Sequence, residues 1–427
     1  MLILASVAAL AAAAGCGTSS AGGAGGTVTS ASPAAGGTSA GPGQATSPTV
    51  TSPTVTSPTV TSQPTGAASL ACGAAESAGG PAAGALTAVQ FVSATRGWAV
   101  GQDTILATAD GGAHWTPQLA GALNLTSVDF VNDQDGWAAG TTSLFATIDG
   151  GATWTRLVEP CPAIRSVHFV SPADGYAVAG GSGTDDANPE IPLTGGEILA
   201  TSDGGHTWHP LPSPPDAQAV CFEDAEHGWL GANGQLYRTA DGGSHWTVLT
   251  SSAGSLGDGQ GAIMNVECAG DGTAWALRTG PGAAMSQEPH VGYHASQSGA
   301  TALFAEQYFQ TPGATPTGQA PGSYAGPFSA LSPSAAVFVD NCVACGPGTA
   351  PWDLVTNSGA TLAKEGDVGD ITSAETASFV SAQAGWVAGT DMTYHAGAFS
   401  SQQRIVATTD GGRTWHIEYA GPWTTGN

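Results

Sequence analysis

The residues in this chain that are best spaced for chemistry are five aspartates, each followed by a Gly-Gly pair. The pattern Thr-x-Asp-Gly-Gly-x-(Thr/His)-Trp places its aspartate and tryptophan at Asp110 and Trp115, Asp149 and Trp154, Asp203 and Trp208, Asp241 and Trp246, and Asp410 and Trp415. A carboxylate can serve as a general acid or base, but one active site does not need five equivalent acids. Aspartate also accepts backbone N–H bonds in tight turns, and glycine adopts angles that other residues resist. We therefore interpret the motif as a turn between two strands, with the tryptophan buried on the return strand.

Two other groups of residues could bind metals or carry out redox chemistry. Asp185, Asp186 and Glu190 could offer oxygen ligands to Ca²⁺, but they lack the regular alternation of a calcium loop. Cys342 and Cys345 form a Cys-x-x-Cys pair, but the chain has no second pair to complete a zinc site. No helical pattern surrounds this pair, as a thioredoxin-type motif requires. The sequence thus predicts no metal site and no cofactor.

The elements that position these residues belong to an internal repeat of about 40 residues. Two degenerate copies of the turn, at 296–303 and 356–363, carry Ser298 and Ser358 at the aspartate position. With these copies the repeat predicts an all-β, seven-bladed β-propeller over 81–427; six blades with 328–364 as an insertion is the alternative. The expected first strand pairs are Leu86 to Gly101, Leu125 to Gly140, Ile164 to Gly180, Ala217 to Ala232, Ile263 to Thr279, Phe328 to Cys345 and Glu375 to Gly389.

Each blade is expected to contain four strands, and the innermost strand should line a central channel. In one repeat these strands would be Ser127 to Val131, Gly136 to Gly140, Leu144 to Ile148 and Trp154 to Val158. The Asp-Gly-Gly turns and the turns between first and second strands then share one end of the propeller. Variation in length falls at the other end, in segments 180–196, 250–262, 279–292, 305–329 and 389–403.

Long loops on one face of a repeat protein usually carry its binding function. We therefore predict a binding site over the channel mouth at this long-loop end. Candidate residues there are the three acidic residues Asp185, Asp186 and Glu190, together with His290, Tyr308, Tyr324, Tyr394 and His395. Packing of the loops themselves is the alternative explanation for the aromatic and histidine residues.

The first 80 residues have the composition of an export signal followed by a linker. Residues 1–15 form an apolar run that is too short to span a bilayer and suits a lipoprotein signal peptide. Ala-Ala-Gly-Cys at its end predicts lipidation of Cys16. No Lys or Arg precedes Arg96, so we expect the natural start to lie upstream. Residues 16–80, rich in Gly, Ala, Ser, Thr and Pro, cannot form a core and predict a disordered linker.

Charge and cysteine content restrict the partners and the compartment. The chain has 8 basic and 33 acidic residues and a net charge of −25. This field opposes nucleic acid and acidic lipid, so we expect contact with the membrane through a lipid anchor only. The six cysteines after Cys16 suggest three disulfides, with 15 possible connectivities. Cys221 and Cys268 occupy nearly matching places on neighbouring first strands, which favours that bridge; Cys342 could then pair with Cys345, and Cys72 with Cys161.

The repeated turn resembles the Asp-box, or BNR repeat, of sialidases, sortilins and xyloglucanases. Strand pairs such as LTSVDFVNDQDGWAAG (125–140), with Gly-Trp in the second strand, look most like the photosystem assembly and stability factor family. The resemblance covers roughly 86–419 and implies a seven-bladed propeller. The resemblance also implies an alternative function, that of a sialidase-like hydrolase, in which three arginines clamp a carboxylate beside a Tyr nucleophile. Arg165, Arg278 and Arg404 could approach the long-loop end, but Arg278 and Arg404 fall on strands away from the axis.

The sequence favours a non-catalytic, exported lipoprotein on the outer face of the cytoplasmic membrane. We expect a monomer that presents its long-loop end to an extracytoplasmic protein or glycan, and that assists assembly as the photosystem factor resemblance implies. A sialidase-like glycoside hydrolase is the alternative. The arrangement of the three arginines at the channel mouth would distinguish these functions.

Overall fold

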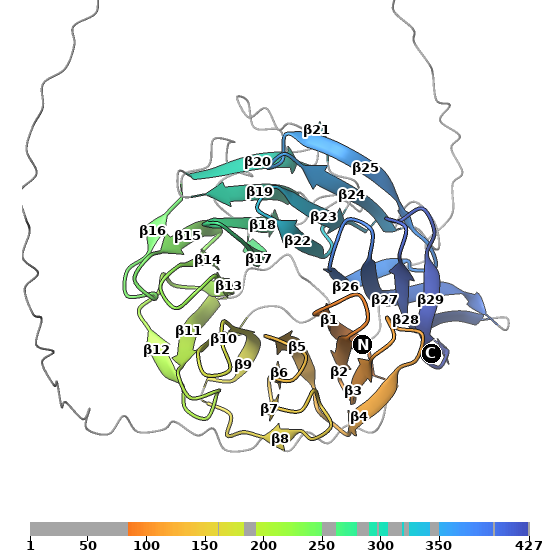
Figure 1. Ribbon diagram of the computed structural model, residues 1–427, viewed down its shortest axis with the longest axis horizontal. Coiled ribbons are helices and arrows are strands. Elements are labelled where there is room, and N and C mark those ends of the chain that lie inside the picture. Colours follow the sequence, from red (N-terminus) through yellow and green to blue (C-terminus); the bar gives the residue numbers. More distant parts are fainter. Residues whose placement is uncertain are drawn as a thin grey trace, which may run out of the picture. The chain divides into compact units, whose positions relative to one another are not determined.

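The described part of the chain is a ring of β-sheets. The computed structural model describes residues 84–160, 162–182, 194–249, 262–279, 290–296, 299–305, 318–319, 324–341, 350–395 and 398–425. All regular elements in these ranges are strands, and they form seven sheets of four or five strands. The sheets surround a central axis as the blades of a propeller (Figure 1). The prediction of seven blades is confirmed, and 328–364 is a blade rather than an insertion.

The blades follow one another in chain order. Blade 1 contains β1 (Leu86–Phe91), β2 (Gly97–Gly101), β3 (Thr104–Thr108) and β4 (Thr116–Ala120); blade 2 contains β5 (Leu125–Phe130), β6 (Gly136–Gly140), β7 (Ser143–Thr147) and β8 (Thr155–Arg156). Blade 3 contains β9 (Ile164–Phe169), β10 (Gly175–Ser182), β11 (Thr194–Thr201) and β12 (His209–Leu211); blade 4 contains β13 (Ala217–Phe222), β14 (Gly228–Ala232), β15 (Gln235–Thr239) and β16 (Thr247–Val248). Blade 5 contains β17 (Ala262–Gly270), β18 (Thr273–Thr279), β19 (His290–Ser296), β20 (Gly299–Ala305) and β21 (Gly318–Gln319). Blade 6 contains β22 (Phe328–Ser332), β23 (Ala335–Val339), β24 (Ala350–Thr356) and β25 (Thr361–Val368); blade 7 contains β26 (Ser373–Phe379), β27 (Gly385–His395), β28 (Ala398–Thr408), β29 (His416–Ala420) and β30 (Thr424–Thr425).

The Asp-box turns have the structural role that the sequence indicates. In blade 2, Asp149 Oδ1 accepts the backbone N–H of Thr153 at 2.9 Å. Gly150 and Gly151 have φ of +69° and +85°, which residues with a Cβ resist. Gly150 also donates its N–H to Gln134 O at 2.9 Å, in the turn between the first two strands. Equivalent aspartate bonds close the boxes of blades 1, 3, 4 and 7, so these turns define one end of the propeller, the Asp-box end.

The degenerate boxes form shorter turns. In blade 6, Asn357 and Ser358 take the left-handed backbone of the missing glycine pair, each with φ of +54°. Ser358 uses its N–H rather than its side chain, donating to Ser334 O at 3.0 Å in the neighbouring turn. Ser358 therefore does not replace the box aspartate. In blade 5, Ser296 pairs directly with Gly299, and Ser298 lies outside the described residues.

Aromatic side chains join neighbouring blades. The Phe130 ring at the end of β5 stacks flat on Trp98 of blade 1, with centroids 3.5 Å apart, and contacts Trp154 edge-on at 5.9 Å. A Cβ at Gly136 would collide with the Phe130 ring, so the glycine of each Gly-Trp pair makes room for the phenylalanine. Trp98 is fully buried, whereas Trp154 is partly exposed. The Gly-Trp tryptophans are thus deeper in the core than the Asp-box tryptophans.

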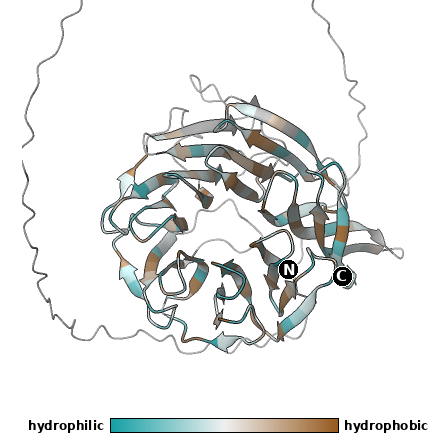
Figure 2. Ribbon diagram, viewed as in Figure 1, coloured by the Kyte–Doolittle hydropathy of each residue, from teal (hydrophilic) through white to brown (hydrophobic). Residues whose placement is uncertain are grey.

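The ring closes without a strand shared between its first and last blades. Each sheet is built from consecutive strands, and hydrophobic residues follow those strands (Figure 2). At the junction of blades 7 and 1, Trp386 Nε1 donates to Gly111 O at 2.7 Å, and the Trp386 ring stacks on Phe91 at 3.5 Å. Leu86 N–H donates to Gln403 Oε1 at 3.3 Å. Side chains therefore close the ring.

One segment predicted as a loop is a hairpin. Residues 389–403 continue β27 and β28, which pair without interruption from Gly385↔Thr408 to His395↔Ala398. The strand-favouring residues of this segment allow the ladder to extend beyond the blade. β30 adds to β28 through Ser400↔Thr425. The long-loop end of blade 7 thus carries a three-stranded ribbon.

Candidate functional site

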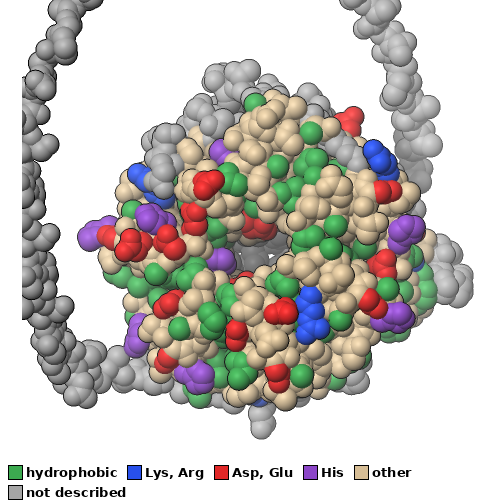
Figure 3. All heavy atoms as spheres, in the orientation of Figure 1, with side chains coloured by type: hydrophobic (Ala, Val, Ile, Leu, Met, Phe, Trp, Pro, Cys, Tyr) green, Lys and Arg blue, Asp and Glu red, His purple; other side chains and the backbone are tan. Residues whose placement is uncertain are grey.

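A cavity of about 790 Å³ occupies the axis of the propeller and is lined by the innermost strands of all seven blades. Figure 3 shows the opening at the centre of one face, with Asp and Glu side chains spread around it. The ionisable side chains among the lining residues are Asp129, His168, Glu267 and Glu375, and none of the lining residues is Lys or Arg. The cavity wall is therefore polar and acidic.

Seven side chains at the same place on the innermost strands join each blade to the next. Asp129 Oδ2 accepts the N–H of Phe169 at 2.5 Å, and Glu267 Oε2 accepts the N–H of Ala330 at 2.7 Å. At the closing junction, Ser378 Oγ accepts the N–H of Phe91 at 2.9 Å. We call the full set the lateral ring; its members are Gln90, Asp129, His168, Cys221, Glu267, Ser329 and Ser378.

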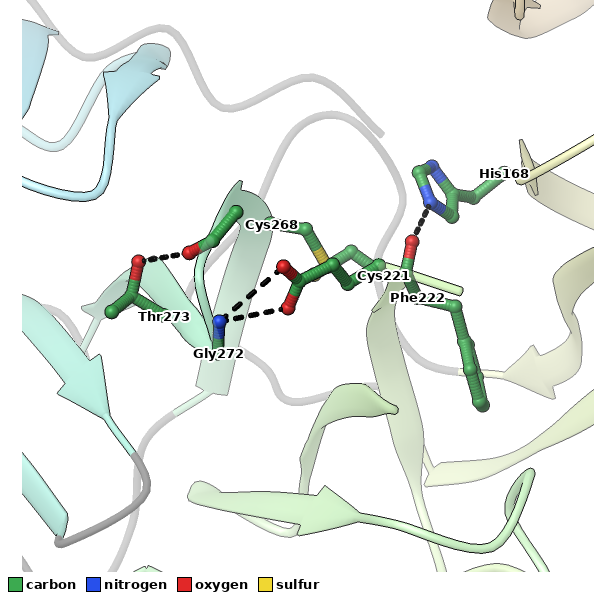
Figure 4. Close-up of a disulfide and its surroundings, with 8 residues drawn as sticks. His168, Cys221, Phe222, Cys268, Gly272 and Thr273 are labelled. Carbon is green, nitrogen blue, oxygen red and sulfur yellow. Dashed lines mark hydrogen bonds between the residues drawn. A yellow bond between two sulfur atoms is a disulfide. The ribbon is translucent and has the colours of Figure 1, made fainter. Parts of the chain in front are cut away.

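The lateral ring is covalent at one junction. Cys221 of β13 forms a disulfide with Cys268 of β17, with Cα atoms 5.7 Å apart (Figure 4). In the preceding junction His168 Nε2 donates to Phe222 O at 2.8 Å, as Figure 4 also shows. The predicted Cys221–Cys268 bridge is confirmed. The other candidate cysteines, Cys72, Cys161, Cys342 and Cys345, lie outside the described residues, as does Cys16.

The two acidic members of the lateral ring are shielded from water. Desolvation raises the pKa of Asp129, while the nearby His168 opposes that shift. Desolvation also raises the pKa of Glu267 to about 7, against hydrogen bonds from Ala330 and Asn265. Both carboxylates already accept backbone N–H groups of the next blade. The hydrogen bonds of Asp129 and Glu267 therefore have a structural role, because they join one blade to the next.

A second row of polar side chains surrounds the cavity mouth at the long-loop end. Thr87, Thr126, Gln218 and Glu375 are the extra residues of β-bulges in β1, β5, β13 and β26, and all four line the cavity. The Thr87 hydroxyl donates to Leu125 O of the next blade at 2.7 Å. Thr126 and Glu375 are exposed. These two side chains are the parts of the mouth most accessible to a partner.

The three candidate clamp arginines lie in different blades, and none lines the cavity. Arg404 Nη2 lies 2.9 Å from Asp391 Oδ2, and Arg404 Nη1 donates to Asp370 O at 2.9 Å, so intramolecular partners hold this side chain. Arg165 donates to Gly180 O in its own blade at 3.5 Å. Arg278 is only 8% exposed. The structure does not bring the three guanidinium groups together at the mouth.

His290, predicted to lie on the exposed long-loop face, is instead completely buried. Its Nε2 atom lies 2.8 Å from Asp340 Oδ2, and both side chains are at most 1% exposed. This pair joins β19 of blade 5 to the end of β23 in blade 6, so His290 holds two blades together instead of facing a partner.

The other predicted long-loop residues are described only in part. Tyr324 is partly buried and bridges to Asn341. The backbone of Tyr394 and His395 ends β27. Asp185, Asp186, Glu190 and Tyr308 lie outside the described residues. Within the described ranges, no group of three or more His, Cys, Asp or Glu residues could hold a metal ion, and no helix is long and apolar enough to cross a membrane.

Sequence reasoning missed the lateral ring. Its members differ in type, so they share no motif, yet five of them lie one residue before the end of the first strand of their blade, and Glu267 and Ser329 lie three residues before the ends of β17 and β22. The repeated phenylalanine before Gly-Trp was the available signal. Aligning the repeats on Phe91, Phe130, Phe169, Phe222 and Phe379 places a polar residue or cysteine before each of them.

Comparisons with known proteins found similarity to one family and to several solved structures. Residues 80–213 match the model of the family described as Photosynthesis system II assembly factor YCF48. No curated protein sequence matches the chain. Similar solved structures include an ancestral GH74 enzyme, at 13% identity and a TM-score of 0.48, covering 82% of this chain and 55% of that one. The RRP9 WD40 repeats match at 9% identity, with a TM-score of 0.48 and coverage of 80% and 94%. A PL25 ulvan lyase matches at 8% identity, with a TM-score of 0.41 and coverage of 69% and 82%.

The seven sheets and the five Asp-box turns define the class: the chain is a BNR-type, or Asp-box, β-propeller. Within that class its first three blades are similar to the Photosynthesis system II assembly factor YCF48 family. The chain spans just over half the length of the GH74 enzyme. The Cys221–Cys268 disulfide indicates an oxidising compartment outside the cytoplasm.

Proposed function

We propose that this propeller is a non-catalytic binding module that receives its partner at the cavity mouth of the long-loop end. The observation that carries the proposal is the use of Asp129 and Glu267 as inter-blade links. Arg404 is likewise held by Asp391 and Asp370. A sialidase-like hydrolase would need carboxylates for acid–base catalysis and arginines to clamp the substrate carboxylate. Here these side chains form intramolecular contacts that hold the fold together. This favours a binding function over the hydrolase alternative.

The proposed setting is the outer face of the cytoplasmic membrane. The Cys221–Cys268 disulfide requires oxidising conditions, and the apolar run 1–15 precedes Cys16 as in exported lipoproteins. In this proposal residues 16–80 act as a tether that would span roughly 40–50 Å as a flexible coil. Such a tether lets the propeller reach partners near the membrane.

The partner in this proposal is an extracytoplasmic protein or glycan, bound by a monomer. The name of the YCF48 family describes an assembly factor, which supports a role in assisting the assembly of a membrane-associated complex. The net charge of −25 opposes nucleic acid and acidic lipid surfaces as partners. The acidic side chains of the cavity wall also repel nucleic acid and acidic lipid.

Site-specific photocross-linking in intact cells tests this proposal. A cross-linking residue at Thr126 or Glu375 reports on the mouth, and one at Ala113 or Gln134 reports on the Asp-box end, where both positions are exposed. We expect a discrete adduct from the mouth positions and none from the other two. Adducts only from Ala113 or Gln134 would refute the assignment of the binding face.

A further inference from the structure

The junction between blades 4 and 5 contains an arginine whose buried Nε–H has no hydrogen-bond partner among the described residues. Arg278 of β18 is only 8% exposed, and its Nε atom forms no hydrogen bond in the structure. Burying an unpaired charge is costly, and buried charges are normally paired. Arg404, whose side chain is largely buried, follows that rule because it forms an ion pair with Asp391. Arg278 therefore needs an anion that its own described surroundings do not supply.

The direction of the Arg278 side chain follows from the ladder. Arg278 pairs directly with Ile263 of β17 and with Val291 of β19. Ile263 and Val291 both pack in the cluster that joins blade 5 to Trp229 of blade 4. Directly paired residues in an antiparallel sheet point to the same face. The Arg278 side chain thus enters the space between blades 4 and 5.

A second unpaired donor lies at the same junction. Gln218, the bulged residue of β13, accepts the N–H of Ile263 through Oε1 at 3.0 Å, but its Nε2 atom is buried without a partner. Gln218 is hydrogen-bonded to the backbone of Ile263, and Arg278 is the strand partner of the same residue, so both lie next to Ile263. Each buried donor left unpaired lowers stability. Two such N–H groups at one place point to a missing acceptor.

The site lies beside the mouth of the axial cavity. Gln218 lines that cavity, as do Leu277 and Thr279 on either side of Arg278, whereas Arg278 itself points to the other face of β18, between blades 4 and 5. Thr279 is the last residue of β18, at the long-loop end. The site is therefore separate from the lateral ring, which uses Cys221 and Cys268 at this junction, and it lies at the face where we place the partner.

We infer that Arg278 and Gln218 form a binding site for a carboxylate between blades 4 and 5, beside the cavity mouth. A planar carboxylate matches the guanidinium fork and can accept from the Gln218 amide at the same time. One arginine can balance one negative charge of a ligand. A second negative charge would be repelled by the chain, whose net charge is −25. The site therefore favours a monoanion over a phosphate dianion. This inference rests on the proposed function, because it gives the chemistry of the group that the partner would insert.

The carboxylate could come from the partner or from this chain. Two acidic residues flank the site in segments that lie outside the described residues: Asp258 in segment 250–261, before β17, and Glu288 in segment 280–289, after β18. The inference assigns the site to an external carboxylate. The double variant Asp258→Asn, Glu288→Gln distinguishes the two sources, because it removes both of these internal candidates and leaves Arg278 and Gln218 unchanged.

The test follows the Arg Nε–H signals of the exported chain by NMR while sodium propionate, or propionamide as the neutral control, is added at constant ionic strength. We expect propionate alone to shift the Arg278 signal, with the same half-saturation in wild type and in the Asp258→Asn, Glu288→Gln double variant. Arg278→Lys identifies the signal. A signal that propionate does not move, that propionamide moves equally, or that responds only in the double variant would overturn the inference.

A second variant keeps the test independent of folding defects at Arg278. Gln218→Glu retains an acceptor for Ile263 N–H and places a carboxylate beside Arg278. We expect a higher melting temperature and a half-saturation for propionate at least about tenfold higher, because the anion is now internal. An unchanged propionate response would contradict the site. Because these readouts need no natural partner, their failure would leave the cross-linking test of the binding face unaffected.

Discussion

Cys221 and Cys268 form a covalent bond at the place where the other six blade junctions have a hydrogen bond from a lateral ring side chain. Cys221 corresponds to Asp129 and Glu267 in the ring, and Cys268 corresponds to the phenylalanines that end other first strands. At this junction one disulfide therefore replaces both the inter-blade hydrogen bond and the stacked phenylalanine. The stability of the junction between blades 4 and 5 should therefore depend on the disulfide.

Reduction should therefore destabilise the ring. Closing the 47-residue separation between the two cysteines constrains the unfolded chain, an effect of about 2–4 kcal/mol. For a domain of this size we expect the melting temperature to fall by about 3–6 °C in reducing agent. The double variant Cys221→Ser, Cys268→Ser should melt at the lower temperature with or without reductant. Equal melting temperatures for oxidised and reduced wild type would contradict this role.

The two tryptophans of blade 2 should differ in their contribution to stability. Trp137 is 3% exposed, stacks on Phe169 at 3.5 Å and donates to Gly204 O, whereas Trp154 is partly exposed. Replacement of a fully buried tryptophan by alanine leaves a cavity and costs about 3–5 kcal/mol. We expect that loss for Trp137→Ala and a smaller one for Trp154→Ala in urea denaturation. The reverse order would contradict the depth assigned to the Gly-Trp pairs.

Glu267 should make stability depend on pH. Burial raises the pKa of Glu267 to about 7 from an ordinary value of 4.5. The folded state then holds this proton more tightly than the unfolded state, so the free energy of unfolding falls as the pH rises from about 4.5 to 7. Glu267→Gln retains an acceptor for Ala330 N–H without the charge, and we expect it to melt about 2–4 °C above wild type at pH 8.

The control for this prediction is Glu226→Gln, an exposed substitution that should follow the wild-type pH profile. The advantage of Glu267→Gln should disappear as the pH falls below 4.5, where the carboxyl of the unfolded wild type also becomes protonated. A lower melting temperature for Glu267→Gln at pH 8 would show that the carboxylate is more stable in the ring than the neutral amide.

The lipid anchor can be tested by a single substitution. Cys16→Ser removes the thiol that lipidation requires, so the protein should move from the membrane fraction to the soluble extracytoplasmic fraction. Cys72→Ser retains Cys16 and should stay with the membrane. Fractionation followed by intact mass measurement checks both expectations, and a Cys16→Ser protein that remains membrane-bound would refute anchoring through this residue.

The repeated turns made the fold predictable from the sequence. Asp149 with Gly150 and Gly151 forms a local turn whose hydrogen bonds involve residues within a few positions, so its structure follows from sequence alone. Counting these turns and their degenerate copies gave seven blades. The same counting placed Cys221 and Cys268 on adjacent first strands, which was sufficient to predict their disulfide.

The site was less predictable because its contacts join different blades. Asp129 binds Phe169, and His290 meets Asp340, across distances in sequence that no local pattern fixes. Whether His290 faces solvent or a neighbouring blade depends on how two sheets pack, which composition does not reveal. The prediction of a loop over 389–403 is wrong for the same reason, because the extension of β27 and β28 depends on pairing between two stretches of similar polarity.

The measurement that tests the central claim most directly is partner recovery by face-specific variants of the full-length chain in its native membrane. Thr126→Trp and Glu375→Trp would obstruct the cavity mouth, whereas Ala113→Trp and Gln134→Trp would alter the Asp-box end. After solubilisation, quantitative mass spectrometry compares the components that each folded variant retains. Recovery of a defined partner with wild type and the Asp-box-end variants, and its loss with the mouth variants, is the predicted result. Loss with Ala113→Trp or Gln134→Trp and retention with the mouth variants would contradict the account.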